Sequence, residues 1–145
     1  MTRAKRMKPV QELFDDTERR LALGLAAIER KVSDAETKLQ ELERYRGDYE
    51  NQFKQRAGRG IGATDLRDYQ AFLARLVEAI RQQQQVVKRA QIERDAERQK
   101  WQDAAKRAKA LGHVVEKWQA EERRASDRRE QRESDERAQR RVTKT

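Results

Sequence analysis

The chain has 145 residues, of which 42% are charged and 35% are hydrophobic, and its formal net charge at pH 7 is +9. Because it contains no cysteine, a disulfide scaffold, a thiolate metal site and a cysteine nucleophile are all excluded. No run approaches the ~20 apolar residues of a membrane-spanning helix. No apolar segment follows the basic start of the chain, so we expect no secretory signal. The apolar fraction is too low for an ordinary globular core, which leaves disorder or a long solvated helix.

The first part of the chain is predicted to be helical. It is rich in Glu, Arg, Gln, Ala and Lys, which are strong helix formers. Pro9 suits the first turn of a helix, so we place the first helix at about residues 9–56. Three glycines follow within residues 57–63, and each would cost a continuous helix ~1 kcal/mol relative to alanine. This glycine-rich segment is therefore predicted to be a turn.

A second, longer helix is expected from about residue 65 to residue 137. Thr64 offers a hydroxyl as N-cap, and Asp65 places negative charge in the first turn. The remaining tail, to residue 145, is expected to fray. We treat the whole chain, residues 1–145, as a single coiled-coil domain.

Both helical segments carry apolar residues at alternating spacings of three and four. Fourteen of the eighteen a and d positions between Leu66 and Ala125 are apolar. So narrow a stripe is typical of a coiled-coil seam. A short turn between two such helices predicts an all-α fold, an antiparallel two-helix hairpin. In the first helix the stripe comprises Phe14, Leu21, Leu25, Ile28, Val32, Ala35, Leu39, Leu42, Tyr49 and Phe53.

Folding at the turn pairs residues whose numbers sum to about 122, such as Phe53 with Tyr69. The first helix then runs out opposite His113. We therefore expect Val114, Val115 and Trp118 to have no helix of this chain covering them, which makes Val115 and Trp118 a candidate site for a partner or for self-association. Where Arg94 and Glu97 interrupt the stripe, we expect the weakest part of the seam, since buried charge there has no evident partner.

The two sides of the hairpin differ. In an antiparallel pair, e positions meet e positions and g positions meet g positions. The e side of the first helix is acidic, whereas Tyr45 and Phe72 occupy g positions that are usually charged. These aromatic residues predict an exposed apolar ridge that binds a partner. The alternative is that they merely widen the core near the turn.

We find no pattern that predicts catalysis, a metal site or a cofactor. His113 is the only histidine, and no cysteine or carboxylate cluster stands at ligand spacing. The glycines of the turn lack the following Lys-Ser/Thr of a phosphate-binding loop, and no strand precedes them. The charge of +9 permits nucleic-acid binding, but basic and acidic residues alternate, so we expect no nucleic acid as partner.

The order and spacing of residues around the turn, and a motif in the tail, resemble the flagellar FliJ family. The tail motif combines Arg129-Glu-Gln-Arg132 with residues 135–140. Around the turn the matching residues are Tyr45, Tyr49, Gly60, Ile61, Tyr69, Gln70, Ala71, Phe72, Leu76, Ala79, Ile80 and Gln82.

The resemblance implies a non-enzymatic stalk in the flagellar type III export apparatus. Family members are two-helix coiled coils that sit in the export ATPase hexamer with both termini toward the ring. They bind the cytoplasmic domain of the export-gate membrane protein and interact with export chaperones. This implies a cytoplasmic protein peripherally associated with the inner-membrane export apparatus. The alternatives are the equivalent stalk of a virulence-type injectisome and a generic structural or nucleic-acid-binding coiled coil.

Two sets of residues carry the implied binding. Lys38 and Gln83 depart from the residue types of the family, which puts the edges of the gate surface in question. The implied export-gate surface is Lys38, Leu42, Tyr45, Tyr49, Phe72, Leu76, Ala79 and Gln83. The implied ATPase-ring end is Arg6, Lys8, Leu13, Phe14, Val115 and Trp118.

Overall fold

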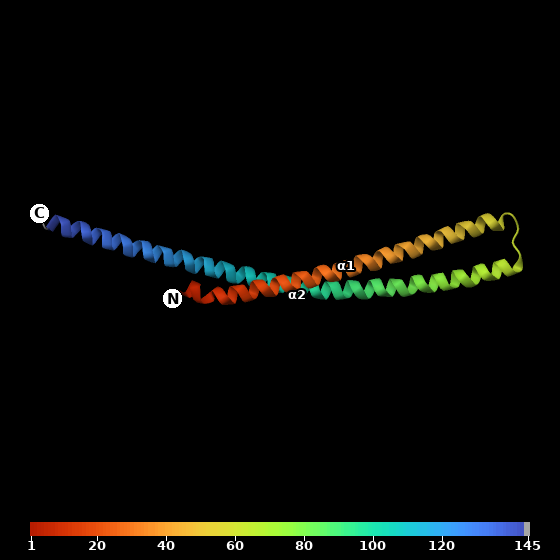
Figure 1. The fold of residues 1–145 in the computed structure, drawn as a ribbon, viewed down its shortest axis with the longest axis horizontal. Helices are drawn as coiled ribbons and strands as arrows, with labels where there is room; N and C mark the ends of the chain where they lie inside the picture. The colour runs from red at the N-terminus through yellow and green to blue at the C-terminus, as the bar shows by residue number, and fades with distance from the viewer. Residues whose placement is uncertain (144–145) are drawn as a thin grey trace. The chain divides into compact units, whose positions relative to one another are not determined.

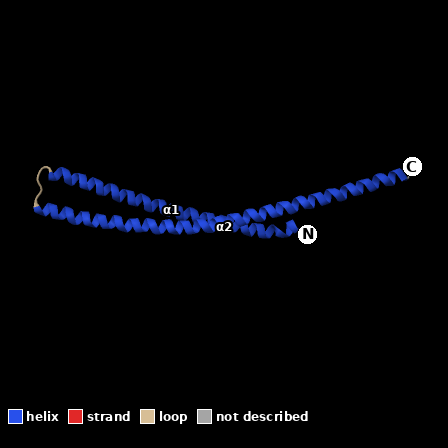
Figure 2. Cartoon of the chain, turned by 180° about the vertical axis from the view of Figure 1, so that it is seen from behind, coloured by secondary structure: helices blue, strands red, loops and turns tan. Residues whose placement is uncertain are grey.

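The structure is a computed structural model that describes residues 1–143. It consists of helix α1 (Arg3–Ala57) and helix α2 (Ala63–Thr143), joined by a short loop (Figures 1 and 2). The helices have 55 and 81 residues, run antiparallel and pack against each other. None of the described residues lies in a strand. The predicted all-α hairpin with a longer second helix is confirmed.

Contacts divide the hairpin into two compact units. The turn unit is Ala22–Lys100 and includes the loop. The terminal unit combines Met1–Leu21 with the part of α2 that begins at Trp101. Both helices pass through both units without a break.

The core of the turn unit is the predicted apolar stripe. Its most buried residues are Ala90 in α2, at 2% exposure, and Val32 in α1, at 3%. Burying each large aliphatic side chain contributes ~1.5–3 kcal/mol, so this seam accounts for most of the pairing energy. The other buried apolar residues are Leu25, Ala35, Leu76, Ile80 and Val87.

One polar residue, Gln83, is buried in this seam with 7% exposure. Its side-chain amide donates a hydrogen bond to the backbone carbonyl of Ala35 at 2.9 Å. A buried amide without a partner is costly, so sliding the helices past each other would lose this bond. Gln83 therefore favours the observed register of the two helices over registers in which one helix is shifted along the other.

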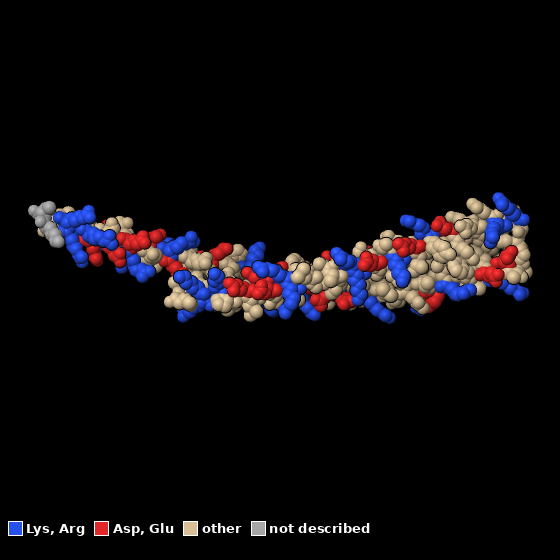
Figure 3. All heavy atoms as spheres, in the orientation of Figure 1, with Lys and Arg blue, Asp and Glu red and all other residues tan. Residues whose placement is uncertain are grey.

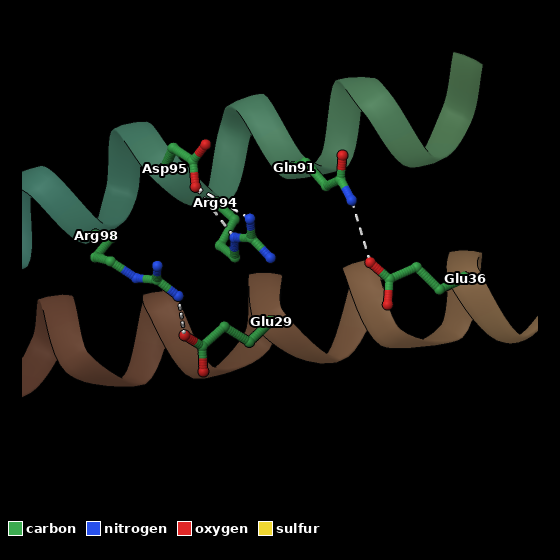
Figure 4. A network of polar contacts seen from close by, with 6 residues as sticks. All are labelled: Glu29, Glu36, Gln91, Arg94, Asp95 and Arg98. Carbon is green, nitrogen blue, oxygen red and sulfur yellow. Dashed lines mark hydrogen bonds and ion pairs between the residues drawn. The ribbon is translucent and has the colours of Figure 1, made fainter. Parts of the chain in front are cut away.

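The expectation that Arg94 and Glu97 lack partners was wrong. The Arg94 side chain, 25% exposed, donates from Nε and Nη2 to Asp95 Oδ1, each at 3.2 Å (Figure 4). Glu97, also 25% exposed, accepts from Lys100 Nζ at 3.1 Å. Both partners lie on the same helix at its solvent edge, which keeps the charges paired without a group from α1.

Polar contacts across the hairpin follow the predicted sides. Two e positions of α1 meet e positions of α2: Glu29 accepts from Arg98 at 3.2 Å, and Glu36 accepts from Gln91 at 3.2 Å (Figure 4). At g positions, Lys31 Nζ donates to Glu93 at 3.1 Å. Exposed pairs of this kind are each worth ~0–1 kcal/mol, so they select the alignment more than they stabilise it.

Helix α1 begins at Arg3, six residues before the predicted start at Pro9. The Thr2 hydroxyl is the N-cap and accepts a hydrogen bond from the Lys5 amide at 3.3 Å. Pro9 consequently lies inside the helix. There it removes the amide that would bond to Lys5 and crowds that carbonyl, at a cost of ~3 kcal/mol.

The extra helical turns continue the apolar repeat toward the N-terminus. Ala4 is buried at 5% exposure, and Met7 and Gln11 are half-buried. These three positions keep the same spacing of three and four as the stripe further on. The repeat was therefore present in the sequence, upstream of the proline.

The ends of α2 also differ from prediction. The Leu66 amide bonds to the Gly62 carbonyl at 3.1 Å, so Gly62 takes the N-cap position expected of Thr64, and the helix starts at Ala63. Asp65 lies in the first turn as predicted. The helix continues beyond residue 137 to Thr143, where the Thr143 hydroxyl bonds to two carbonyls of the last turn. Within the expected frayed tail, residues 144 and 145 lie outside the described part of the chain.

Two glycines should respond oppositely to alanine. Gly24 lies inside α1, and a Cβ there would meet nothing within 4 Å. We expect Gly24→Ala to raise the free energy of unfolding by ~1 kcal/mol. Gly60, in the loop, has φ of 95°, so Gly60→Ala should lower it by ~1 kcal/mol. Urea unfolding followed by circular dichroism measures both, and changes of the same sign would contradict the assigned backbone conformations.

Candidate functional site

Five aromatic rings form one cluster in the turn unit, next to the loop. The Phe53 and Tyr69 rings stack at 3.6 Å, as the pairing rule predicts, and Tyr49 stacks on Tyr69 at 5.2 Å. Tyr49 also lies 4.6 Å from Phe72, which meets the ring of Tyr45 edge-on at 6.0 Å. The pairs whose ring centres lie 4.6–6.0 Å apart add ~0.5–1.5 kcal/mol each beyond area burial. The cluster thus fixes the two helices to each other near the turn.

The outer edge of the cluster is exposed. The Tyr45 side chain is 52% exposed, whereas its aromatic neighbours Tyr49 and Phe72 are half-buried. Val86, another g position, is 43% exposed on α2. Figure 3 shows an area without charged side chains between the two helices near the loop. The predicted apolar ridge on the g side is therefore present, with Tyr45 and Phe72 in contact.

The structure sorts the eight residues of the implied gate surface by accessibility. Leu76 and Gln83 are buried in the seam at 6% and 7% exposure. Their side chains are not offered to a partner while the helices are paired. Lys38 is exposed at a g position of α1. Partly or largely accessible are Leu42, Tyr45, Tyr49, Phe72 and Ala79.

A hollow of about 210 Å³ lies between the aromatic cluster and the loop. Asp65, Asp68 and Arg56 line it together with aromatic rings and Ile61. The sequence analysis did not predict it, because the loop conformation that brings Ile61 over the rings has no local signal beyond its glycines.

In the terminal unit, the expectation that Val115 and Trp118 are uncovered was wrong. Val115 is 2% exposed and is the most deeply buried large side chain. The Arg3 guanidinium lies 4.7 Å from the centre of the Trp118 ring, which is half-buried. The pairing rule itself holds, but α1 starts six residues earlier than predicted and extends the pairing past His113.

Two acidic residues of α2 hold the first turn of α1. Arg3 Nη2 forms an ion pair with Glu121 at 3.2 Å. The Ala4 amide, one of the free N–H groups at the helix start, donates to Glu122 Oε1 at 3.3 Å. Carboxylates at this position are also favoured by the helix dipole. We call this set of contacts, made by Arg3 and Ala4 with Trp118, Glu121 and Glu122, the N-terminal clasp.

The other residues of the implied ring end are more accessible. Arg6 and Lys8 are exposed, and Leu13 is 62% exposed. Phe14 is half-buried. Leu13 and Phe14 line a hollow of about 270 Å³ together with Thr17, Ala104 and Arg107.

Beyond the clasp, α2 continues without α1 beside it (Figures 1 and 2). From Arg123 to Thr143 its side chains are exposed except at Ser126, and basic and acidic groups alternate along it (Figure 3). Arg137 pairs with Glu133 one turn away at 3.8 Å. Such pairs add a few tenths of a kcal/mol each to a solvated helix.

Glu78 and Arg81, an ion pair on the surface of the turn unit, shift each other's pKa. Hydrogen bonds from Arg81 hold the pKa of the Glu78 carboxyl below its usual value, and Glu78 in turn raises the pKa of Arg81. Both side chains lie on the outer face of α2, away from the aromatic cluster. The shift is that of an exposed ion pair within one helix and does not indicate a catalytic group.

Across residues 1–143, no helix has a stretch apolar enough to cross a bilayer. Within the same residues, no three acidic, histidine or cysteine side chains come together as a metal site requires.

Comparison with known proteins gives one match. The model of the family described as Flagellar FliJ protein matches residues 3–145, which is essentially the whole chain. No curated protein matches the sequence, and no solved structure matches it. The match confirms the resemblance that the residues around the turn and in the tail predict.

Proposed function

This chain belongs to the flagellar FliJ family, and we propose that it is the stalk-like part of the flagellar type III export apparatus. Family membership makes it a component related to flagellar protein export. Beyond that, we propose that it links the export ATPase hexamer to the export-gate membrane protein. The role is non-enzymatic: the chain contributes binding surfaces and carries out no chemistry of its own.

The observation that carries the gate contact is the exposed edge of the aromatic cluster. Tyr45 is 52% exposed and rests edge-on against Phe72. A ring held in place by other rings loses little conformational freedom when it binds, and such aromatic anchors dominate many interfaces. The gate-binding surface is accordingly Tyr45 with Leu42, Tyr49, Phe72 and Ala79 around it.

The terminal unit supports binding to the ATPase ring. It contains both ends of the chain, as a stalk that enters a ring with its termini requires. It also displays two cations, Arg6 and Lys8, and the apolar Leu13 on its surface. These accessible groups are the proposed ring contacts, and Val115 supports them from within the core.

The proposed linkage depends on helix continuity. Both helices run from one surface to the other without interruption. An unbroken helical pair transmits displacement through its hydrogen-bonded backbone, so nucleotide-driven changes in the ring would bias the gate. Escort of export chaperones, and a cytoplasmic location at the inner-membrane export apparatus, follow from the family alone and complete the proposal.

Direct binding measurements test this function. We expect the full-length chain to bind the purified export ATPase and, separately, the purified cytoplasmic domain of the export gate, measured by calorimetry at physiological salt. Leu13→Ala should weaken only the ATPase contact. The ATPase of a virulence-type injectisome and a DNA duplex serve as comparison ligands. Absence of ATPase binding, together with tight duplex binding, would replace the proposal with a nucleic-acid-binding coiled coil.

A further inference from the structure

The first six residues of α1 are attached to the rest of that helix by a weakened backbone. Pro9 has no amide hydrogen, so the hydrogen bond to the Lys5 carbonyl is missing within the helix. Residues 3–8 therefore depend on contacts outside their own helix to stay helical and docked. Those contacts are the N-terminal clasp and the seam positions of Ala4 and Met7.

The clasp consists of interactions that open readily. The ion pair between Arg3 and Glu121 is about half exposed on both sides, at 55% and 45%. Ion pairs at this exposure are weak and screened by salt. The remaining contacts are the guanidinium over Trp118 and the single hydrogen bond from the Ala4 amide to Glu122. The only apolar contacts of the segment are those of the small Ala4, 5% exposed, and of Met7, which is half-buried.

The docked segment covers part of the proposed ring-binding end. Val115 is 2% exposed, and Trp118 is half-buried beneath Arg3. A partner that contacts Trp118 directly must first displace Arg3. Such a partner needs a carboxylate that takes the place of Glu121 beside Arg3, and a group that covers the indole in place of the guanidinium.

From this arrangement we infer that residues 3–8 are an autoinhibitory latch over Trp118, hinged at Pro9, which must open before the ATPase ring engages the terminal unit. The inference rests on the proposed function. The latch and the ring contact form an exchange equilibrium, in which the apparent affinity for the ring is reduced by the fraction of molecules that are closed.

Two substitutions should move this equilibrium in opposite directions. Arg3→Ala removes the ion pair and the cation over the indole, so it opens the latch. Pro9→Ala restores the missing helical hydrogen bond, so it closes the latch. Lys5→Ala is the matched control, because it removes a positive charge from the same segment and leaves the Arg3 contacts with Trp118 and Glu121 in place.

The state of the latch is read from Trp118 in a Trp101→Phe background, using the neutral quencher acrylamide. We expect the quenching constant of Trp118 to rise about twofold in Arg3→Ala and in high salt, to fall in Pro9→Ala, and to stay unchanged in Lys5→Ala. Circular dichroism checks that the helices persist. Equal quenching in all variants would overturn the latch whether or not the ATPase binds.

Affinity for the ATPase then tests autoinhibition. We expect Arg3→Ala to bind roughly fivefold more tightly than the unmodified chain, and Pro9→Ala several-fold more weakly. Weaker binding of Arg3→Ala would mean that the ring needs residues 3–8 in their docked position, which overturns the inference but retains the proposed function. Absence of ATPase binding in every variant would overturn the proposed function and, with it, the autoinhibitory role. The quenching measurements would then report only whether residues 3–8 undock from Trp118.

Discussion

Replacing both Tyr45 and Phe72 by alanine is expected to abolish binding to the export gate and to leave the helical circular dichroism signal nearly intact. Tyr45 is 52% exposed, so little of its ring contributes to the core. Phe72 supports it at 6.0 Å and is itself half-buried. Loss of each such anchor typically removes ~2 kcal/mol or more of binding energy, roughly a thirtyfold loss of affinity, so loss of both should leave no detectable binding. Calorimetric titration of the gate domain measures it.

Single variants separate binding from packing. Tyr45→Ala alone should lose most of the affinity with almost no change in stability, while Tyr45→Phe retains the ring and should bind nearly as the unmodified chain does. Ile92→Ala is the control, since it removes an apolar side chain that is 62% exposed elsewhere in the turn unit. If the double variant loses its helical signal, both residues belong to the core. If Ile92→Ala weakens binding equally, the gate does not recognise the aromatic edge.

The second large effect is expected from Val115→Asp. Val115 is 2% exposed, so the new carboxylate would be buried with no partner in the seam. Burying an unpaired charge in place of a valine should destabilise the terminal unit by ~3 kcal/mol or more. We expect Met1–Leu21 to lose hydrogen-exchange protection, while the turn unit keeps its own, because its core is separate.

The neighbouring residue provides a matched control for that experiment. Val114 is 42% exposed, so Val114→Asp places the same charge on the surface of the same helical turn. We expect its effect on stability to stay within ~0.5 kcal/mol. Similar destabilisation by both substitutions would show that Val115 is not a core residue of the terminal unit.

The stripe of apolar residues was sufficient to predict the main pairing. Because the spacing of three and four stops at the glycine-rich turn and resumes in the second helix, the sequence determined which faces meet and where the chain reverses. The contacts of Phe53 with Tyr69 and of Lys31 with Glu93 lie where that register places them. The same register separated the acidic e side from the aromatic g side.

The start of α1 was missed because one strong local signal outweighed several weak ones. Proline favours the first helical turn, so Pro9 predicts that the first helix begins there. Thr2 and the continued repeat through Ala4 and Met7 pointed further upstream. Their signal becomes decisive only when α2 is present, since Glu121 and Glu122 stabilise the early turns from 118 residues away. A contact at that separation has no local pattern.

Accessibility within the candidate surfaces was only partly predictable, because the heptad pattern and the family resemblance gave different answers. Heptad labels place Gln83 and Leu76 in the seam, yet the resemblance places them on a binding surface. The structure shows both buried, with the Gln83 amide bonded to Ala35. A glutamine at a d position turns inward only if a carbonyl of the facing helix lies within reach of its amide. The sequence pattern does not specify that geometry.

The register has a consequence for how the chain is made. Cross-helix contacts join residues 48 positions apart at Gln83 and 118 apart at Glu121. During synthesis, the first helix therefore leaves the ribosome with its apolar stripe open to water, and it closes progressively from the loop outward as the second helix follows. The start of α1 is synthesised first but pairs with α2 last. The apolar stripe near the N-terminus is therefore open to non-native association for the longest time.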